Sequence, residues 1–264
     1  MRNHLSRWAR NAHWLTGRSR PLQRVGWIRG KFRMTPGTQF KGGFARQSCN
    51  YSLYNGAGEA ALIAALVKRT VSRYPVDPSR VYVAGISAGG AMAGVLAYCY
   101  GAMFAACAIA SGVMYRGAES LMEAASAMRR GSRAAPELLA RAAAQNTSGC
   151  AAFVPTFVIH GADDSVVHPR NADQIIEQLR AFAHLVGRPS VPLVESPELR
   201  LSGPGRTYRQ QDYLHNKRIL VRKIIVEGLG HAWSGGDERH PFNDAAGPDA
   251  SRLIWDFVSA FRRS

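Results

Sequence analysis

The stretch VYVAGISAGG, residues Val81–Gly90, decides the fold class. Its first part, Val81–Ile86, is almost entirely apolar, which is typical of a strand buried on both faces of a parallel sheet. Small residues follow in Ala88–Tyr100, which has the length and composition of a packed helix. A strand, a sharp turn at Ser87 and a helix therefore predict the centre of an α/β domain with a mostly parallel sheet.

The segments on both sides continue this alternation. Glu59–Tyr74 predicts an amphipathic helix whose expected inner face consists of Leu62, Ile63, Leu66, Val67 and Thr70. Pro75 ends that helix. The elements expected further along the chain are the strand Phe104–Ala110, one or two helices within 118–146, the buried strand Phe153–His160, the helix Asp173–Leu185, a long proline-rich loop over 187–206, a hairpin of Tyr208–Leu214 and Ile219–Glu227, and the helix Asp249–Phe261.

Charge divides the chain into two parts. Of 34 Lys and Arg residues, eleven lie in residues 1–58, where there is no Asp or Glu. We therefore expect a basic, poorly structured arm over 1–55 and a globular domain over 56–264. Tryptophans among the arginines would also suit contact with nucleic acid, but a solvated leader is the favoured interpretation, and no nucleic-acid partner is expected. The 46% hydrophobic content excludes a wholly disordered chain, and no apolar run approaches the roughly 20 residues of a membrane span.

The four cysteines show neither a CxxC pair nor zinc-ligand spacing, so no metal site is predicted. Cys99 and Cys107 lie in apolar segments and are expected to be buried thiols. Cys49 and Cys150 lie in polar surroundings and could pair in an oxidising compartment. No apolar run typical of a secretion signal follows the basic start.

Gly85-Ile86-Ser87-Ala88-Gly89 is a G-x-S-x-G pentapeptide at the turn between the predicted strand and helix. That setting is required for a nucleophile elbow, in which a strained turn lifts the serine hydroxyl above the sheet edge. The glycines would keep side chains from colliding with neighbouring backbone, and the Ala88 N–H would face a developing oxyanion. The alternative is a glycine-rich turn with an ordinary serine, which the strand and helix on either side disfavour.

A serine needs a base, and eight histidines are available. His231 follows a predicted strand within a glycine-rich loop, which is the best setting for the base. His160 ends another strand but is expected to be structural, and His168 is a second-rank candidate. Surface positions are expected for the others, which are His4, His13, His184, His215 and His240.

A carboxylate must orient the imidazole. Asp163 and Asp164 follow the end of the strand Phe153–His160 and are adjacent, so their side chains should point in different directions. Only one of them can hold His231, and the residues alone leave the choice open.

Six stretches together resemble the polyhydroxybutyrate-depolymerase type of esterase, an α/β-hydrolase family with feruloyl and acetylxylan esterase relatives. The resemblance covers about residues 56–262. The stretches are GEAALIAALV (Gly58–Val67), VDPSRVYVAGISAGGAMA (Val76–Ala93), MFAACAIASG (Met103–Gly112), VIHGADDSVVHPRN (Val158–Asn171), VEGLGHAWSGG (Val226–Gly236) and DAAGPDASRLIWDF (Asp244–Phe257).

The resemblance implies an α/β-hydrolase fold and a set of roles. Ser87 would be the nucleophile and His231 the base. In the family's H-G-x-x-D-x-x-V pattern the aspartate stands three residues after the glycine, which selects Asp164 and leaves Asp163 a bystander. Trp233 and Asn171 would lie near the site and contact substrate by the same analogy. No metal or organic cofactor is implied.

One departure concerns the start of the domain. Relatives carry an H-G-C-x-Q-type segment on leading strands that supplies a second oxyanion donor, and residues 1–55 contain no such motif. The leading strands are therefore expected to be missing or irregular, as in a truncated or out-of-frame start.

The predicted function is hydrolysis of carboxylic esters, with poly- or oligo-(3-hydroxyalkanoate) esters as the expected substrates. A feruloyl- or acetylxylan-type esterase and a hydrolase weakened by the lost oxyanion donor are the alternatives. The resemblance implies an extracellular location, with a cytoplasmic one as the alternative. The oligomeric state is left open.

Overall fold

A computed structural model describes residues 58–146, 152–186, 192–202 and 205–263. All of them belong to one compact unit, Gln39–Ser264. The predicted basic arm over 1–55, and with it the expectation about leading strands, lies outside the described residues.

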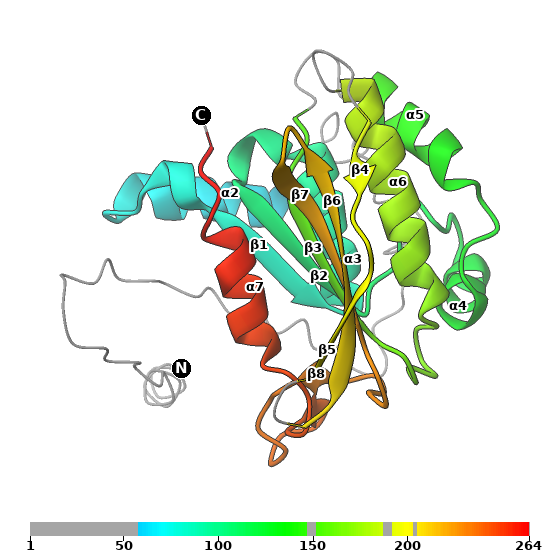
Figure 1. The fold of residues 1–264 in the computed structure, drawn as a ribbon. Helices are drawn as coiled ribbons and strands as arrows, with labels where there is room; N and C mark the ends of the chain where they lie inside the picture. The colour runs from blue at the N-terminus through cyan, green and yellow to red at the C-terminus, as the bar shows by residue number, and fades with distance from the viewer. Residues whose placement is uncertain (1–57, 147–151, 187–191, 203–204, 264) are drawn as a thin grey trace, which may run out of the picture. The chain divides into compact units, whose positions relative to one another are not determined.

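A seven-stranded sheet forms the centre of this unit (Figure 1). Its order is β1-β2-β3-β7-β6-β4, and β5 also pairs with β6. The first four strands in this order run parallel, whereas β6 runs antiparallel to β7 and to both β4 and β5. The strands are β1 (Tyr82–Ile86), β2 (Ala106–Ala110), β3 (Thr156–Gly161), β4 (Val194–Glu195), β5 (Leu199–Ser202), β6 (Thr207–His215) and β7 (Arg218–Val226).

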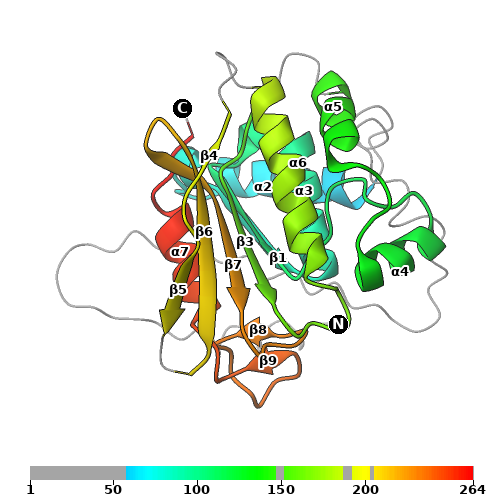
Figure 2. The ribbon, with the colours of Figure 1, turned by 45° about the vertical axis from the view of Figure 1, so that its right-hand side comes forward.

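Helices cover both faces of the sheet (Figure 2). On one face α3 and α6 pack on the parallel strands, and on the other α7 packs on β2 and β3. Two apolar clusters, one on each side, form the core. The helices are α2 (Glu59–Arg73), α3 (Ala88–Cys99), α4 (Leu121–Arg130), α5 (Pro136–Asn146), α6 (Arg170–Val186) and α7 (Ala250–Val258).

The alternation of strands and helices predicted from the sequence is confirmed, with one addition. The proline-rich stretch expected to be a loop contains β4 and β5, which pair with β6. Leu199-Arg200-Leu201-Ser202 does alternate apolar and polar residues, which is the strand pattern. β6 is nine residues long, so pairing with β4 and β5 satisfies backbone groups along its outer edge.

The inner face predicted for α2 is right in part, because Ile63 and Val67 pack against the core but Leu62 and Leu66 do not. Leu62 and Leu66, expected to face inward, are 62% and 51% exposed, whereas Ala60 and Ala64 are buried. Among the described elements α2 packs on α3, and the residues of α2 that are buried completely are the small Ala60 and Ala64.

The strand β1 is half-buried, not buried on both faces as predicted, and Ala84 at its middle is exposed. Its one strand partner among the described residues is β2. The apolar run was read correctly as a strand, but its composition does not reveal how deeply the strand is buried.

The two described cysteines differ. Cys107 is a free, buried thiol, as predicted, and burial raises its pKa well above the usual range. Cys99 is disulfide-bonded, so the expectation of a thiol at that position is wrong. An apolar sequence context does not separate a buried thiol from a buried disulfide, because both are apolar.

The turn after β1 is strained at Ser87, whose φ of 57° and ψ of −122° are rare for a residue with a side chain. A Cβ on Gly85 would lie 2.1 Å from the backbone oxygen of Gly89, so the turn can close only around a glycine. The expectation that both outer glycines avoid collisions holds for Gly85 alone, because a Cβ on Gly89 would meet nothing within 4 Å.

This asymmetry gives a matched pair of variants. Gly85→Ala should lower the free energy of unfolding by about 2–3 kcal/mol, since backbone must move to admit the methyl group. Gly89→Ala, in the first turn of α3, should leave it unchanged or raise it by up to about 1 kcal/mol, because alanine favours helix. Urea unfolding of both variants measures the difference, and equal effects would contradict the crowding seen at Gly85.

Candidate active site

Four described strands that run parallel, β1, β2, β3 and β7, end at the same edge of the sheet. In register, Ile86 of β1 lies beside Ala110 of β2, and Ala110 lies beside Ile159 of β3. Further along, Gly161 of β3 lies beside Val226 of β7. The loops after these strands carry the three residues singled out from the sequence, which are Ser87, Asp164 and His231. Carboxyl ends of parallel strands are where α/β proteins bind ligands.

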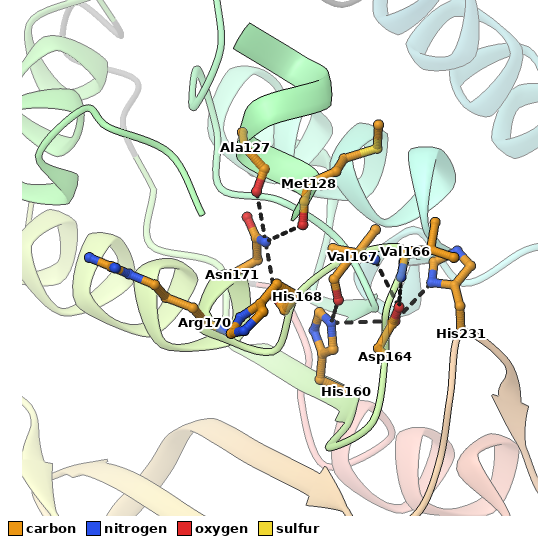
Figure 3. A network of polar contacts seen from close by, with 10 residues as sticks. All are labelled: Ala127, Met128, His160, Asp164, Val166, Val167, His168, Arg170, Asn171 and His231. Atoms are coloured by element: carbon orange, nitrogen blue, oxygen red, sulfur yellow. Dashed lines mark hydrogen bonds and ion pairs between the residues drawn. The ribbon is translucent and has the colours of Figure 1, made fainter. Parts of the chain in front are cut away.

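Asp164, the aspartate that the resemblance selected, is hydrogen-bonded to His231 (Figure 3). The distance from His231 Nδ1 to Asp164 Oδ2 is 2.8 Å. The other carboxylate oxygen, Oδ1, accepts hydrogen bonds from the backbone N–H groups of Val166 at 3.0 Å and Val167 at 2.8 Å. Because an ionised carboxylate only accepts, Nδ1 carries the proton, and Nε2 of His231 is left as the basic nitrogen.

Asp164 keeps its charge although it is only 2% exposed. Burial by itself raises the pKa of this carboxyl group. The hydrogen bonds from His231 and from the Val167 N–H outweigh burial, and the pKa lies below its usual value. A buried carboxylate that stays ionised at neutral pH can fix the imidazole tautomer and stabilise the imidazolium that forms when His231 takes a proton.

The loops that carry Asp164 and His231 are joined through backbone contacts. The N–H of Ala162 donates to the carbonyl of Val226 at 2.9 Å, and that of Asp163 donates to Leu229 at 3.0 Å. Gly161 makes this approach possible, since a Cβ there would lie 2.1 Å from the carbonyl oxygen of Leu229. The short distance between carboxylate and imidazole therefore depends on a glycine that ends β3.

Ser87 lies at the same edge with its hydroxyl uncommitted. A serine before a helix ordinarily caps the first turn, but the side chain of Ser87 makes no capping hydrogen bond to α3. Ser87 is half-buried, and Ala88 follows as the first residue of α3. The N–H of Ala88 belongs to the first turn, where amides have no acceptor within the helix.

No hydrogen bond joins Ser87 to His231, both of which the structure describes. Hydrogen bonds between a nucleophile and its base are often long before substrate binds. The structure thus pairs Asp164 with His231 and places Ser87 on the neighbouring part of the same edge.

The two neighbours proposed to contact substrate differ in position. Trp233 is half-buried in β8 (Trp233–Ser234), two residues after His231, and its Nε1 donates to Ser251 Oγ at 3.2 Å. β8 pairs with β9 (Asn243–Asp244) in a small sheet beyond the end of β7 (Figure 2). Trp233 therefore stays a candidate for substrate contact.

Asn171 is completely buried, which does not fit the expected contact with substrate. Its Nδ2 donates to the carbonyls of Ala127 at 3.0 Å, Met128 at 3.2 Å and His168 at 2.9 Å (Figure 3). We correct the assignment accordingly. Asn171 fastens the end of α4 to the loop before α6, and its polar groups are turned inward because three carbonyls converge there.

Of the three remaining candidates, Asp163 and His168 are exposed, whereas His160 is buried. Asp163 is exposed and does not hold an imidazole, as the bystander role predicts. His168 is exposed, and its Nδ1 accepts from the N–H of Arg170 at the start of α6. His160, expected to be structural, lies beside Asp164 with its Nε2 3.5 Å from Oδ2. Sequence reasoning also missed the amides of Val166 and Val167, for which the valine at the end of the H-G-x-x-D-x-x-V pattern was the available signal.

The described residues contain neither a cluster of metal-ligand side chains nor a helix suited to span a membrane. Within that part of the chain, no three His, Cys, Asp or Glu side chains are grouped so as to hold a metal ion. None of the described helices has the length and apolar character needed to cross a membrane.

Two curated esterases are similar in sequence to this chain over about two thirds of its length. Poly(3-hydroxyalkanoate) depolymerase C of Paucimonas lemoignei is 33% identical over 67% of this chain and 41% of its own length. Feruloyl esterase B of Neurospora crassa is 36% identical over 68% of this chain and 60% of its own length. The chain thus spans about two to three fifths of the length of these curated relatives.

A solved esterase structure has a similar fold. The solved structure of an acetyl xylan esterase from Aspergillus awamori superposes with a TM-score of 0.55, at 21% identity, over 78% of this chain and 68% of that one. Residues 42–189 match the family described as Esterase PHB depolymerase, and that range is more than half of the chain. The chain therefore belongs to the PHB-depolymerase esterase family and has the fold of an α/β-hydrolase.

Proposed function

We propose that this protein is a serine hydrolase of carboxylic esters, with Ser87 as nucleophile, His231 as base and Asp164 as the group that orients it. The observation that carries the proposal is the bond between Asp164 and His231 at the sheet edge where the strained turn presents Ser87. Membership in an esterase family supports the same reaction.

The reaction follows from these positions. Nε2 of His231 takes the hydroxyl proton of Ser87 as Oγ attacks the ester carbonyl carbon, and the carbonyl oxygen becomes an oxyanion next to the Ala88 N–H. When the tetrahedral intermediate collapses, the bond to the alkoxy oxygen breaks, and His231 returns its proton to the leaving alcohol. Water then attacks the acyl-Ser87 ester by the same steps, which releases the carboxylic acid and restores the serine.

As substrates we propose esters of 3-hydroxyalkanoic acids, in oligomers or in the polymer. The names of the relatives support two classes, since one is a poly(3-hydroxyalkanoate) depolymerase and others are feruloyl and acetylxylan esterases. The second class is therefore the alternative. Val166, in the same loop as Asp164, is 49% exposed and would give an acyl group an apolar surface. An oxyanion hole with one donor would give a weakened enzyme of the same chemistry.

We also propose that the protein functions outside the cytoplasm. The disulfide at Cys99 supports an oxidising compartment, where such bonds form and persist. Immunoblotting of culture medium and cell fractions from the source organism tests this, and a chain confined to the cytosolic fraction would contradict it.

Replacing the nucleophile tests the function directly. Ser87→Ala should reduce hydrolysis of p-nitrophenyl esters and of 3-hydroxybutyrate oligomers by at least about 10⁴-fold, because no other group supplies the attacking oxygen. Ser111→Ala is the matched control. Ser111 also follows a strand of the sheet, has a positive φ of 44° and is 2% exposed, and its loss should leave most of the activity. Equal activity of Ser87→Ala and the parent protein would refute the assignment.

The two adjacent aspartates give a second test. Asp164→Asn should lower kcat by about 10⁴-fold, since an amide favours the wrong imidazole tautomer. Asp163→Asn should lower kcat less than about tenfold, because its side chain is exposed and does not contact His231. Steady-state kinetics of both variants at one pH decide the matter, and the reverse ranking would show that Asp164 is not the orienting group.

A further inference from the structure

His160 is a second imidazole against the proposed catalytic carboxylate. It lies near the end of β3 and is 1% exposed. Its Nε2 is 2.7 Å from the carbonyl oxygen of Val167 and 3.5 Å from Asp164 Oδ2. A carbonyl oxygen can only accept, so Nε2 carries the proton and donates it to Val167. His160 and His231 therefore flank the same carboxylate, as Figure 3 shows.

Val167 is hydrogen-bonded both to His160 and to Asp164. Val167 accepts from His160 through its carbonyl group and donates through its own N–H to Asp164 Oδ1 at 2.8 Å. Holding Val167 in place aims that N–H at Oδ1 and leaves Oδ2 for His231. We propose that His160 is a positioning residue of the esterase site, which fixes the loop 162–167 so that Asp164 presents Oδ2 to His231.

The charge state of His160 suits this role. Burial lowers its pKa and outweighs the opposing effects of the Val167 carbonyl and of Asp164. Three titratable groups act on it, which are Asp164, His231 and Asp173. His160 therefore stays neutral near neutral pH. A second imidazolium beside Asp164 would compete with His231 for the negative charge that stabilises the reacting imidazolium.

An ordinary core histidine would satisfy both of its ring nitrogens. Nδ1 of His160 is buried and has no hydrogen-bond partner among the described residues. Among the described residues the polar contacts of His160 are confined to Nε2, which faces Val167 and Asp164. The donor at Nε2 is the part of the ring that the site uses.

The test separates positioning from stability with three variants. His160→Leu removes the donor, while His160→Gln places an amide N–H at about the reach of Nε2. The matched control is Gln178→Leu. Gln178 is 1% exposed and bonds the backbone N–H and carbonyl of Tyr115 at 2.9 and 2.8 Å, away from the proposed site. Should His160→Leu fail to fold, His160→Asn, which is polar but too short to reach Val167, replaces it.

The inference rests on the proposed esterase function, so it is measured both with and without turnover. With a p-nitrophenyl ester, His160→Leu should lower kcat by about 10- to 100-fold with KM within about twofold, because the carboxylate is misplaced and substrate binding is not affected. His160→Gln should recover most of the loss. Gln178→Leu should lower stability and leave kcat unchanged. A kcat for His160→Leu equal to that of Gln178→Leu, or no recovery with Gln, would overturn the proposal.

The second measurement needs no substrate. The Nδ1–H proton of His231, held against Asp164, should give a low-field proton NMR resonance in the parent protein and in His160→Gln. It should move upfield or disappear through exchange in His160→Leu. If the parent protein hydrolyses no ester, the proposed function fails, and this resonance alone still decides the role of His160. An unchanged resonance in His160→Leu would overturn it.

Discussion

The hydrogen bond between Asp164 Oδ2 and His231 Nδ1 is the interaction on which the proposed chemistry depends. It joins loops that follow two neighbouring strands, β3 and β7, and it exists only because Gly161 lets those loops pass within backbone contact. The buried carboxylate keeps its charge because it receives backbone N–H groups as well as the imidazole. Ordinary sheet geometry brings the loops to one edge, and local hydrogen bonds then set the direction of each side chain.

Ser87, the proposed nucleophile, is positioned by a different means, which is backbone strain. Ser87 is held with a positive φ between β1 and α3, and the crowding at Gly85 leaves little freedom in the turn. A strained residue persists only where the surrounding structure determines it, and here the strand, the helix and the bond from Ser87 N–H to the Ala110 carbonyl at 2.9 Å do so. The same sheet therefore supports a rigid serine and a hydrogen-bonded pair without a separate scaffold for either.

Sequence patterns predicted much of this arrangement. The strand–turn–helix around Ser87 and the strand ending before His231 follow from local composition, and the choice of Asp164 over Asp163 came from resemblance. The errors have physical causes. Leu62 and Leu66 on α2 were assigned inward because hydrophobicity alone does not reveal which residues of a helix meet its neighbours. Asn171 was expected to contact substrate and is instead buried against three carbonyl groups, since a side chain's partners depend on contacts between distant segments that local sequence does not encode.

Chemical modification tests the central claim most directly, because it requires Ser87 to be activated in the folded protein. The chain is treated with a fluorophosphonate, digested, and mapped by mass spectrometry, with Asp164→Asn treated in parallel. The account predicts one adduct, on Ser87, formed much more slowly in Asp164→Asn. An adduct on another serine, or modification of Ser87 at the same rate in both proteins, would contradict it.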